Sequence, residues 1–132
     1  MYQILVPVDD DVNRAAAQAR HVTELPGAPT DVSVTVAHAY PDTNRTNGKP
    51  DEESPAVIEA IENLRDAGVA VEQRELYVPV AEGILDLAAD IEADTIVMSG
   101  RKRSPAGKAM FGSVTQAVIL NGTVPITVVD VE

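Results

Sequence analysis

A basic segment with small residues at its end, within residues 95–129, has the side chains best suited to bind an anion. The chain of 132 residues contains 21 aspartates and glutamates and has a formal net charge of −11, yet none of these acids falls inside the segment. The segment holds four of the ten cationic residues: Arg101, Lys102, Arg103 and Lys108. A local positive charge in an acidic protein favours a negatively charged ligand.

The residues around these cations predict a strand, a loop and a helix. Apolar residues 95–98 come before the basic loop, and Gly112 and Ser113 come after it, followed by apolar residues at helical spacing from Val114. A loop at the carboxyl end of a strand leaves backbone N–H groups free to face a ligand. Phosphate groups are bound by this geometry.

The segment that follows predicts a second buried strand after the helix. Gly122 is expected to end the helix in a left-handed conformation, and residues 124–129 are strongly strand-forming. In the five-stranded sheet that the whole sequence predicts, this strand lies at an edge, where its unpaired N–H and C=O groups would face water. We therefore expect a homodimer whose contact includes Val124 to Val129.

Three consecutive aspartates follow the first apolar run of the sequence, residues 2–8, which has the character of a central parallel strand. Asp10 or Asp11 can cap the helix that begins next. Asp9 is placed where the strand ends, so its carboxylate can instead accept hydrogen bonds from the ribose hydroxyls of a ligand.

Strands and helices are predicted to alternate along the whole chain. Strands are expected at 2–8, 31–39, 69–78, 95–98 and 124–129, and helices at 12–25, 54–68, 79–93 and 113–122. Ser54 is the expected N-cap of the second helix. The polar middle of the third strand is typical of a sheet edge.

This alternation predicts an α/β fold, a doubly wound and mostly parallel five-stranded sheet of Rossmann-like type with strand order 3-2-1-4-5. Two helices should cover each face, because the apolar strands at 2–8 and 95–98 need cover on both sides. The topological switch then falls between the first and fourth strands. Asp9 and the loop that begins at Ser99 should meet in one crevice there.

Composition limits the class of protein further. Hydrophobic residues make up 45% of the chain but aromatic residues only 3%, and the length fits one domain over residues 1–132. Cysteine is absent, which excludes disulfides, thiolate metal sites and a cysteine nucleophile. No apolar run approaches the ~20 residues of a membrane span, so we expect a soluble, cytoplasmic protein with no membrane partner.

The acidic composition leads to two further expectations. The negative field opposes nucleic acid, whose phosphates need a broad basic face. It is also typical of proteins from halophilic organisms, in which salt screens the repulsion between like charges. An ordinary acidic protein is the alternative.

His38 is a candidate for catalysis that the sequence does not support. No serine or aspartate stands at a spacing typical of nucleophilic catalysis with it. A buried histidine with a hydrogen-bond partner is the expected outcome.

The whole chain resembles the universal stress protein family. The matching stretches are ILVPVD at residues 4–9, HA at 38–39, DTIVM at 94–98, FGSVT at 111–115 and VPITVV at 124–129. The resemblance implies an adenine nucleotide, ATP (with Mg²⁺) or AMP. It implies that Asp9 meets the ribose, that Pro7, Val8 and Ala39 frame the adenine, and that the last loop and helix start hold phosphates through Ser99, Gly100, Arg101, Lys102, Arg103, Gly112, Ser113, Val114 and Thr115.

The sequence departs from the phosphate-binding pattern of this family at two positions. Nucleotide-binding members have glycine, two residues, glycine, nine residues and then Gly-Ser or Gly-Thr. Counting back from Gly112, the first two glycine positions are occupied by Ser99 and Lys102. A side chain there can fill the space for a phosphate or forbid a positive φ. The adjacent arginines, in contrast, are strong charged donors to phosphate.

Three functions remain open from the sequence. The first is a stress-response module that binds an adenine nucleotide without rapid catalysis. The second is a dimeric regulatory or interaction protein, with an unknown protein partner, that has lost ATP binding and holds only phosphate or sulfate. The third is an enzyme acting on another substrate, for which no residue set is apparent. Ser113 has a simpler alternative role as a helix cap.

Overall fold

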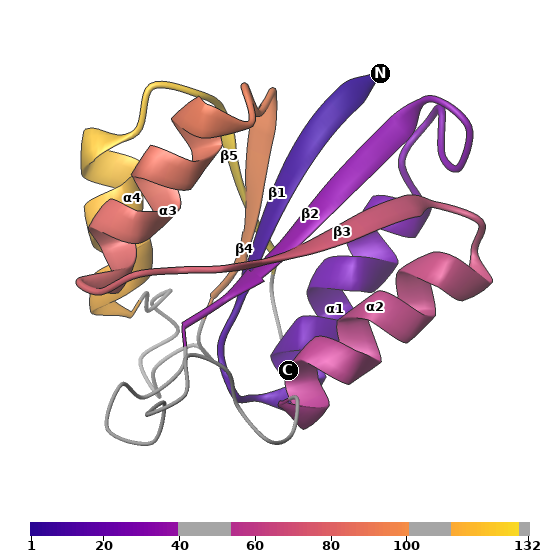
Figure 1. The fold of residues 1–132 in the computed structure, drawn as a ribbon, viewed down its shortest axis with the longest axis horizontal. Helices are drawn as coiled ribbons and strands as arrows, with labels where there is room; N and C mark the ends of the chain where they lie inside the picture. The colour runs from indigo at the N-terminus through magenta and orange to yellow at the C-terminus, as the bar shows by residue number, and fades with distance from the viewer. Residues whose placement is uncertain (40–53, 101–111, 130–132) are drawn as a thin grey trace, which may run out of the picture.

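The fold is given by a computed structural model, which describes residues 1–39, 54–100 and 112–129. Within these ranges five strands alternate with four helices along the chain, as predicted (Figure 1). Most ends differ from the predicted ones by one to three residues. The elements are β1 (Tyr2–Val8), α1 (Val12–Thr23), β2 (Val32–His38), α2 (Pro55–Asp66), β3 (Ala70–Glu75), α3 (Val80–Asp90), β4 (Thr95–Ser99), α4 (Ser113–Asn121) and β5 (Ile126–Val129).

The five strands form one sheet in the order β3-β2-β1-β4-β5, which is the order that the sequence predicted. Every neighbouring pair is parallel. Helices α1 and α2 pack on one face of the sheet, and α3 and α4 pack on the other (Figure 1). Strands β1 and β4 therefore lie next to each other at the centre of the molecule.

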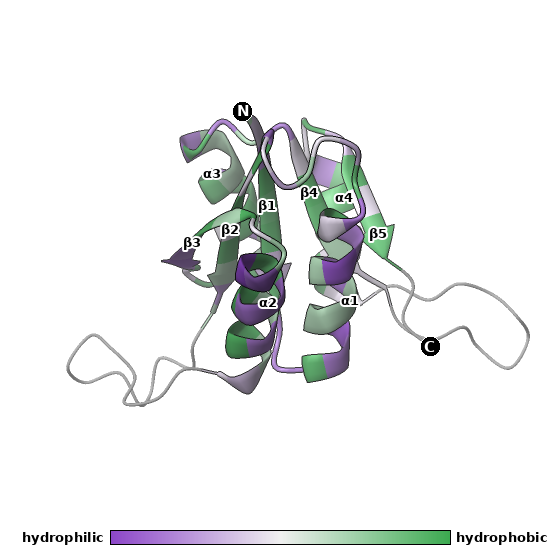
Figure 2. Ribbon diagram, turned by 90° about the vertical axis from the view of Figure 1, so that its right-hand side faces the viewer, coloured by the Kyte–Doolittle hydropathy of each residue, from purple (hydrophilic) through white to green (hydrophobic). Residues whose placement is uncertain are grey.

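The two faces of β1 and β4 are both buried, which explains their near-continuous apolar sequences. Ile4 and Val97 pack with α1 and α2, whereas Leu5 and Ile96 pack with α3 and α4, and all four are at most 1% exposed. Figure 2 shows hydrophobic residues along β1 and hydrophilic residues along β3. Strand β3 is an edge strand, as its polar middle predicted.

Two helix starts follow the predicted capping chemistry. The carboxylate of Asp11 accepts the backbone N–H of Arg14 at the start of α1 (3.0 Å). The hydroxyl of Ser54 accepts the backbone N–H of Ala56 at the start of α2 (3.2 Å), with proline at the next position. Each cap satisfies an N–H group that has no partner within its helix.

The prediction of a left-handed glycine at the end of α4 is wrong. Gly122 has φ −77° and ψ 154°, an extended conformation that other residues also adopt. Glycine is required there for space instead, since a Cβ atom would lie 2.7 Å from the carbonyl oxygen of Val118 and 3.1 Å from Cδ1 of Ile126. The close approach lets the chain turn from α4 directly into β5.

Two features bear on how the molecule meets its surroundings. In the described ranges, no helix combines the length and the apolar character needed to cross a membrane. Strand β5 forms the sheet edge opposite β3, with all four residues partly exposed, and the neighbouring helix α4 exposes Leu120. A homodimer through this edge stays a prediction.

Replacing Val128 by proline tests that interface. Pro125 and Val129 direct their carbonyl groups at β4, so the N–H of Val128 points away from the sheet, on the side where a second copy would pair. We expect the wild type to be a dimer by light scattering, Val128→Ala to stay dimeric, and Val128→Pro to become a monomer because it lacks that donor. Salt should strengthen association of two chains that each carry −11. A monomer mass for the wild type from low to molar salt would reject the interface.

Candidate functional site

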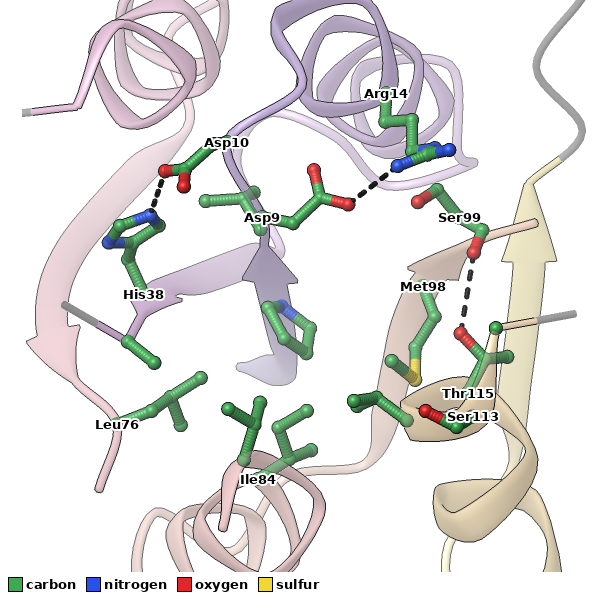
Figure 3. A pocket seen from close by; sticks show the side chains of 16 residues that line it. Asp9, Asp10, Arg14, His38, Leu76, Ile84, Met98, Ser99, Ser113 and Thr115 are labelled. Atoms are coloured by element: carbon green, nitrogen blue, oxygen red, sulfur yellow. Dashed lines mark hydrogen bonds and ion pairs between the residues drawn. The ribbon is translucent and has the colours of Figure 1, made fainter. Parts of the chain in front are cut away.

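A cavity of about 280 Å³ opens at the carboxyl ends of β1 and β4 (Figure 3). It lies at the predicted switch point, where the strand order reverses. Nine of the thirteen residues that the sequence proposed line it together: Pro7, Val8, Asp9, Ala39, Ser99, Gly112, Ser113, Val114 and Thr115. Seven more lining residues were not proposed: Asp10, Arg14, His38, Leu76, Val80, Ile84 and Met98.

Of the other four proposed residues, only Gly100 lies within the described ranges, and it is not among the residues that line the cavity. Gly100 directly follows β4 and donates its N–H to the carbonyl of Val129 (2.8 Å), so it joins β4 to β5. Arg101, Lys102 and Arg103 lie outside the described residues. Ser99, at the first departure from the glycine pattern, is the last residue of the extended strand β4, so no positive φ is required there.

One side of the cavity is apolar. Leu76 comes from the segment after β3, Val80 and Ile84 from α3, and Met98 from β4. Sequence reasoning missed these residues because it treated the last strand–loop–helix unit and the end of β1 as the site. From the sequence alone, a hydrophobic residue on a helix that covers the sheet cannot be recognised as one that also faces a ligand.

Asp9 projects into the cavity, and both of its carboxylate oxygens accept hydrogen bonds from residues at the start of α1. One oxygen accepts the backbone N–H of Asp11 (2.9 Å), and the other accepts Nη1 of Arg14 (2.8 Å). The side chain is still 53% exposed. A carboxylate can accept about four hydrogen bonds, so Asp9 retains capacity for hydroxyl groups of a ligand.

Asp10 and His38 form a second polar contact at the rim. The ring Nε2 of His38 lies 2.8 Å from Oδ1 of Asp10, and the hydroxyl of Ser54 lies 3.4 Å from the same oxygen. His38 is therefore a buried histidine with a partner, as predicted. Asp10 is not the helix cap, a role that Asp11 fills. Instead it connects the β1–α1 loop to β2 and to the start of α2.

The amino end of α4 faces the cavity without a side-chain cap. Gly112 is the N-cap residue and has no side chain, so the alternative role of Ser113 as the cap is wrong. Ser113 is exposed in the first turn, and the hydroxyl of the buried Thr115 lies 3.5 Å from the carbonyl of Ser99, a weak hydrogen bond. Uncapped N–H groups and the helix dipole give this end a partial positive charge.

The described residues contain no group of three histidine, aspartate or glutamate side chains placed to hold a metal ion. The arrangement instead suits an organic anion. It combines an apolar wall, a hydrogen-bond acceptor and a helix amino terminus around one cavity.

Comparison with known proteins places this architecture in a family. The model of the Universal stress protein family matches residues 1–130. The chain belongs to the universal stress protein family. A search of curated proteins found no match.

Solved structures of other universal stress proteins share the fold. The universal stress protein of Archaeoglobus fulgidus is 30% identical, with 98% of each chain covered and a TM-score of 0.72. A structure of the universal stress protein from Archaeoglobus fulgidus in complex with dAMP aligns with 26% identity, 98% coverage of each chain and a TM-score of 0.67. A universal stress protein in complex with cAMP is 20% identical, with 99% of this chain and 98% of the other covered and a TM-score of 0.73.

The apolar wall of the site in this universal stress protein depends on Gly83 in α3. A Cβ atom at residue 83 would lie 2.3 Å from the carbonyl oxygen of Tyr77, so the segment between β3 and α3 would have to move. We expect Gly83→Ala to lower the free energy of unfolding by about 1–3 kcal/mol in urea denaturation. Glu82→Ala, at an exposed neighbouring position, is the matched control and should have little effect. Equal stability of the two variants would show that the segment between β3 and α3 can move without loss of folding free energy.

Proposed function

We propose that this universal stress protein binds an adenine nucleotide in the cavity between β1 and β4. The arrangement of the lining residues carries the proposal. Figure 3 shows Leu76 and Ile84 on one side of the cavity, Ser113 and Thr115 on the other, and Asp9 between them. These positions match the three chemical parts of a nucleotide, an apolar base, a ribose with hydroxyl donors and an anionic phosphate.

The ligands of two relatives support a site that recognises an adenine base and one phosphate group. The related structures contain dAMP and cAMP. The first ligand lacks the 2′-hydroxyl, and in the second the 3′-oxygen is esterified, so each presents only one free ribose hydroxyl. Adenine and a phosphate on the 5′-oxygen are common to both. AMP, with two free hydroxyls for Asp9, is therefore the natural first ligand to test.

The size and charge of the cavity favour a mononucleotide. Its volume of about 280 Å³ lies near the lower end of the ~300–1,000 Å³ of small-molecule sites. In a protein of net charge −11, the phosphate needs local donors, and the amino end of α4 supplies them. The neighbouring cations at residues 101–103 would add charge if they approach the ligand.

We propose binding without rapid hydrolysis. The sequence has no Walker-type glycine loop ending in Lys-Ser or Lys-Thr. The protein then acts as a stress-response module that responds to the nucleotide. The alternative, a regulatory dimer that binds only phosphate or sulfate, is favoured by Ser99 and Lys102 at the glycine positions.

Calorimetric titration with AMP, ATP and phosphate separates the two functions. For a nucleotide site, Asp9→Ala removes acceptors for the ribose and Ser113→Ala removes a donor to the phosphate. Each should weaken AMP binding by about 1–3 kcal/mol, roughly 5- to 150-fold. Asp90→Ala and Thr123→Ala are matched controls, because they remove the same groups at exposed positions that do not line the cavity.

An anion site gives a different pattern. Asp9→Ala would then leave phosphate binding unchanged or improve it, because removing a carboxylate relieves repulsion. No heat with millimolar AMP or ATP, together with a phosphate response that does not depend on Asp9, would reject the nucleotide function.

A further inference from the structure

Gln18 is a buried polar residue of α1 that lies behind the cavity and bonds to both strands that form it. The residue is 1% exposed. Its Nε2 donates to the carbonyl oxygen of Pro7 in β1 (2.7 Å) and to the carbonyl oxygen of Val97 in β4 (2.9 Å). One amide group therefore joins two neighbouring strands, although it belongs to neither.

The carbonyl group of Val97 lacks a ladder donor because residue 7 is proline. Pairing of β1 with β4 ends at Leu5 and Ile96. In a parallel ladder a residue bonds to the residues on either side of its partner, so Leu5 bonds to Thr95 and Val97. The next bond would run from the N–H of residue 7 to the carbonyl of Val97, and proline has no N–H.

The pairing of the same strands on their other sides shows that the break is local. Strand β1 stays paired with β2 as far as Val8 and His38, and β4 stays paired with β5 as far as Ser99 and Val129. Only the β1–β4 ladder stops early. Proline is unusual in a central strand for this reason, because it leaves a buried carbonyl without a donor.

The orientation of the Gln18 amide follows from the same two contacts. Only the nitrogen can face two carbonyl oxygens, since rotating the amide would bring Oε1 against both. In the described part of the chain Oε1 has no hydrogen-bond partner. The core therefore retains a glutamine although its Oε1 is unpaired. This indicates that the two N–H donors of the amide are needed to bond the carbonyl groups of the two strands.

We propose that Gln18 is a positioning residue of the nucleotide site, which fixes the separation of β1 and β4 by replacing the hydrogen bond to Val97 that Pro7 removes from the ladder and by donating a second one to the carbonyl of Pro7. The residues that follow these carbonyls are Val8 and Asp9 after Pro7, and Met98 and Ser99 after Val97, and all four line the cavity. The separation of the strands therefore sets the distance between the ribose acceptor and the β4 side of the site. This role in binding rests on the proposed function.

A double-mutant cycle on stability tests the hydrogen-bond substitution without any ligand. Gln18→Met keeps the size of the side chain and removes both donors, so two buried carbonyls each lose a hydrogen bond and Tm should fall by roughly 5–10 °C. Pro7→Ala restores an N–H at residue 7. In that background Gln18→Met should lower Tm by clearly less, because the backbone donor can bond to Val97.

Val22→Ala is the matched control for the cycle. Val22 is a fully buried residue of α1, one turn beyond Gln18, with an apolar side chain that has no hydrogen-bonding group. Its Tm loss should be the same with proline or alanine at residue 7. If Gln18→Met also costs the same in both backgrounds, Gln18 is an ordinary core residue and the proposal is wrong.

AMP titration of the same variants tests the link to the cavity. At a temperature where all variants are folded, Gln18→Met should weaken AMP binding roughly tenfold or more, because a small displacement of positioning groups is costly, whereas Val22→Ala should leave it unchanged. Equal affinities in Gln18→Met and the wild type would overturn the positioning role. A wild type that does not bind AMP would reject the proposed function instead, and the stability cycle would still decide whether Gln18 replaces the ladder bond to Val97.

Discussion

The separation of β1 and β4 at their carboxyl ends is the feature on which the rest of the site depends. In a parallel sheet of this order the two central strands would normally stay hydrogen-bonded along their length, and their side chains would fill the space between the covering helices. Here the ladder stops after Leu5 and Ile96, because the next donor position is Pro7. The amide of Gln18 donates to the carbonyls of Val97 and Pro7, so the strands can part without leaving the carbonyl of Val97 unpaired.

The groups around this opening are fixed by short local contacts. Asp9 is held by the backbone of Asp11 and by Arg14, and Asp10 is held by His38. These contacts fix an exposed carboxylate on the wall of the cavity before any ligand arrives, which lowers the entropy cost of binding. The N-terminus of α4 lies on the opposite side, with a glycine at the capping position. An acidic protein can thus keep a small site for an anion, because the attractive donors act at short range and salt screens the distant charges.

Much of the fold could be predicted from the sequence because its signals are local and strong. Apolar runs at residues 2–8 and 95–98, alternating with helices capped by Asp11 and Ser54, are sufficient for a parallel sheet, and the handedness of its connections limits the strand order. The end of α4 was mispredicted because Gly122 is needed for its small size and not for a positive φ. Sequence spacing does not reveal which atoms will crowd a turn.

The site could be predicted only where its residues belong to one strand end or one loop. Asp9, Ser99 and Ser113 follow recognisable strands or precede a helix, whereas Leu76, Ile84 and Arg14 reach the cavity only through the packing of separate elements. Gln18 could not be identified either. A lone glutamine in an alanine-rich helix predicts an exposed side chain, and its role becomes visible only when the missing N–H of Pro7 is considered together with the sheet register.

Methyl NMR of the protein during titration with AMP tests the central claim most directly, namely that the opening between β1 and β4 receives the adenine of a nucleotide. The account predicts that the signals of Leu76, Ile84 and Met98 shift with AMP, through the ring current of the base, and do not shift with ribose 5-phosphate or inorganic phosphate. Shifts confined to the amino end of α4, or equal effects of AMP and phosphate, would contradict it.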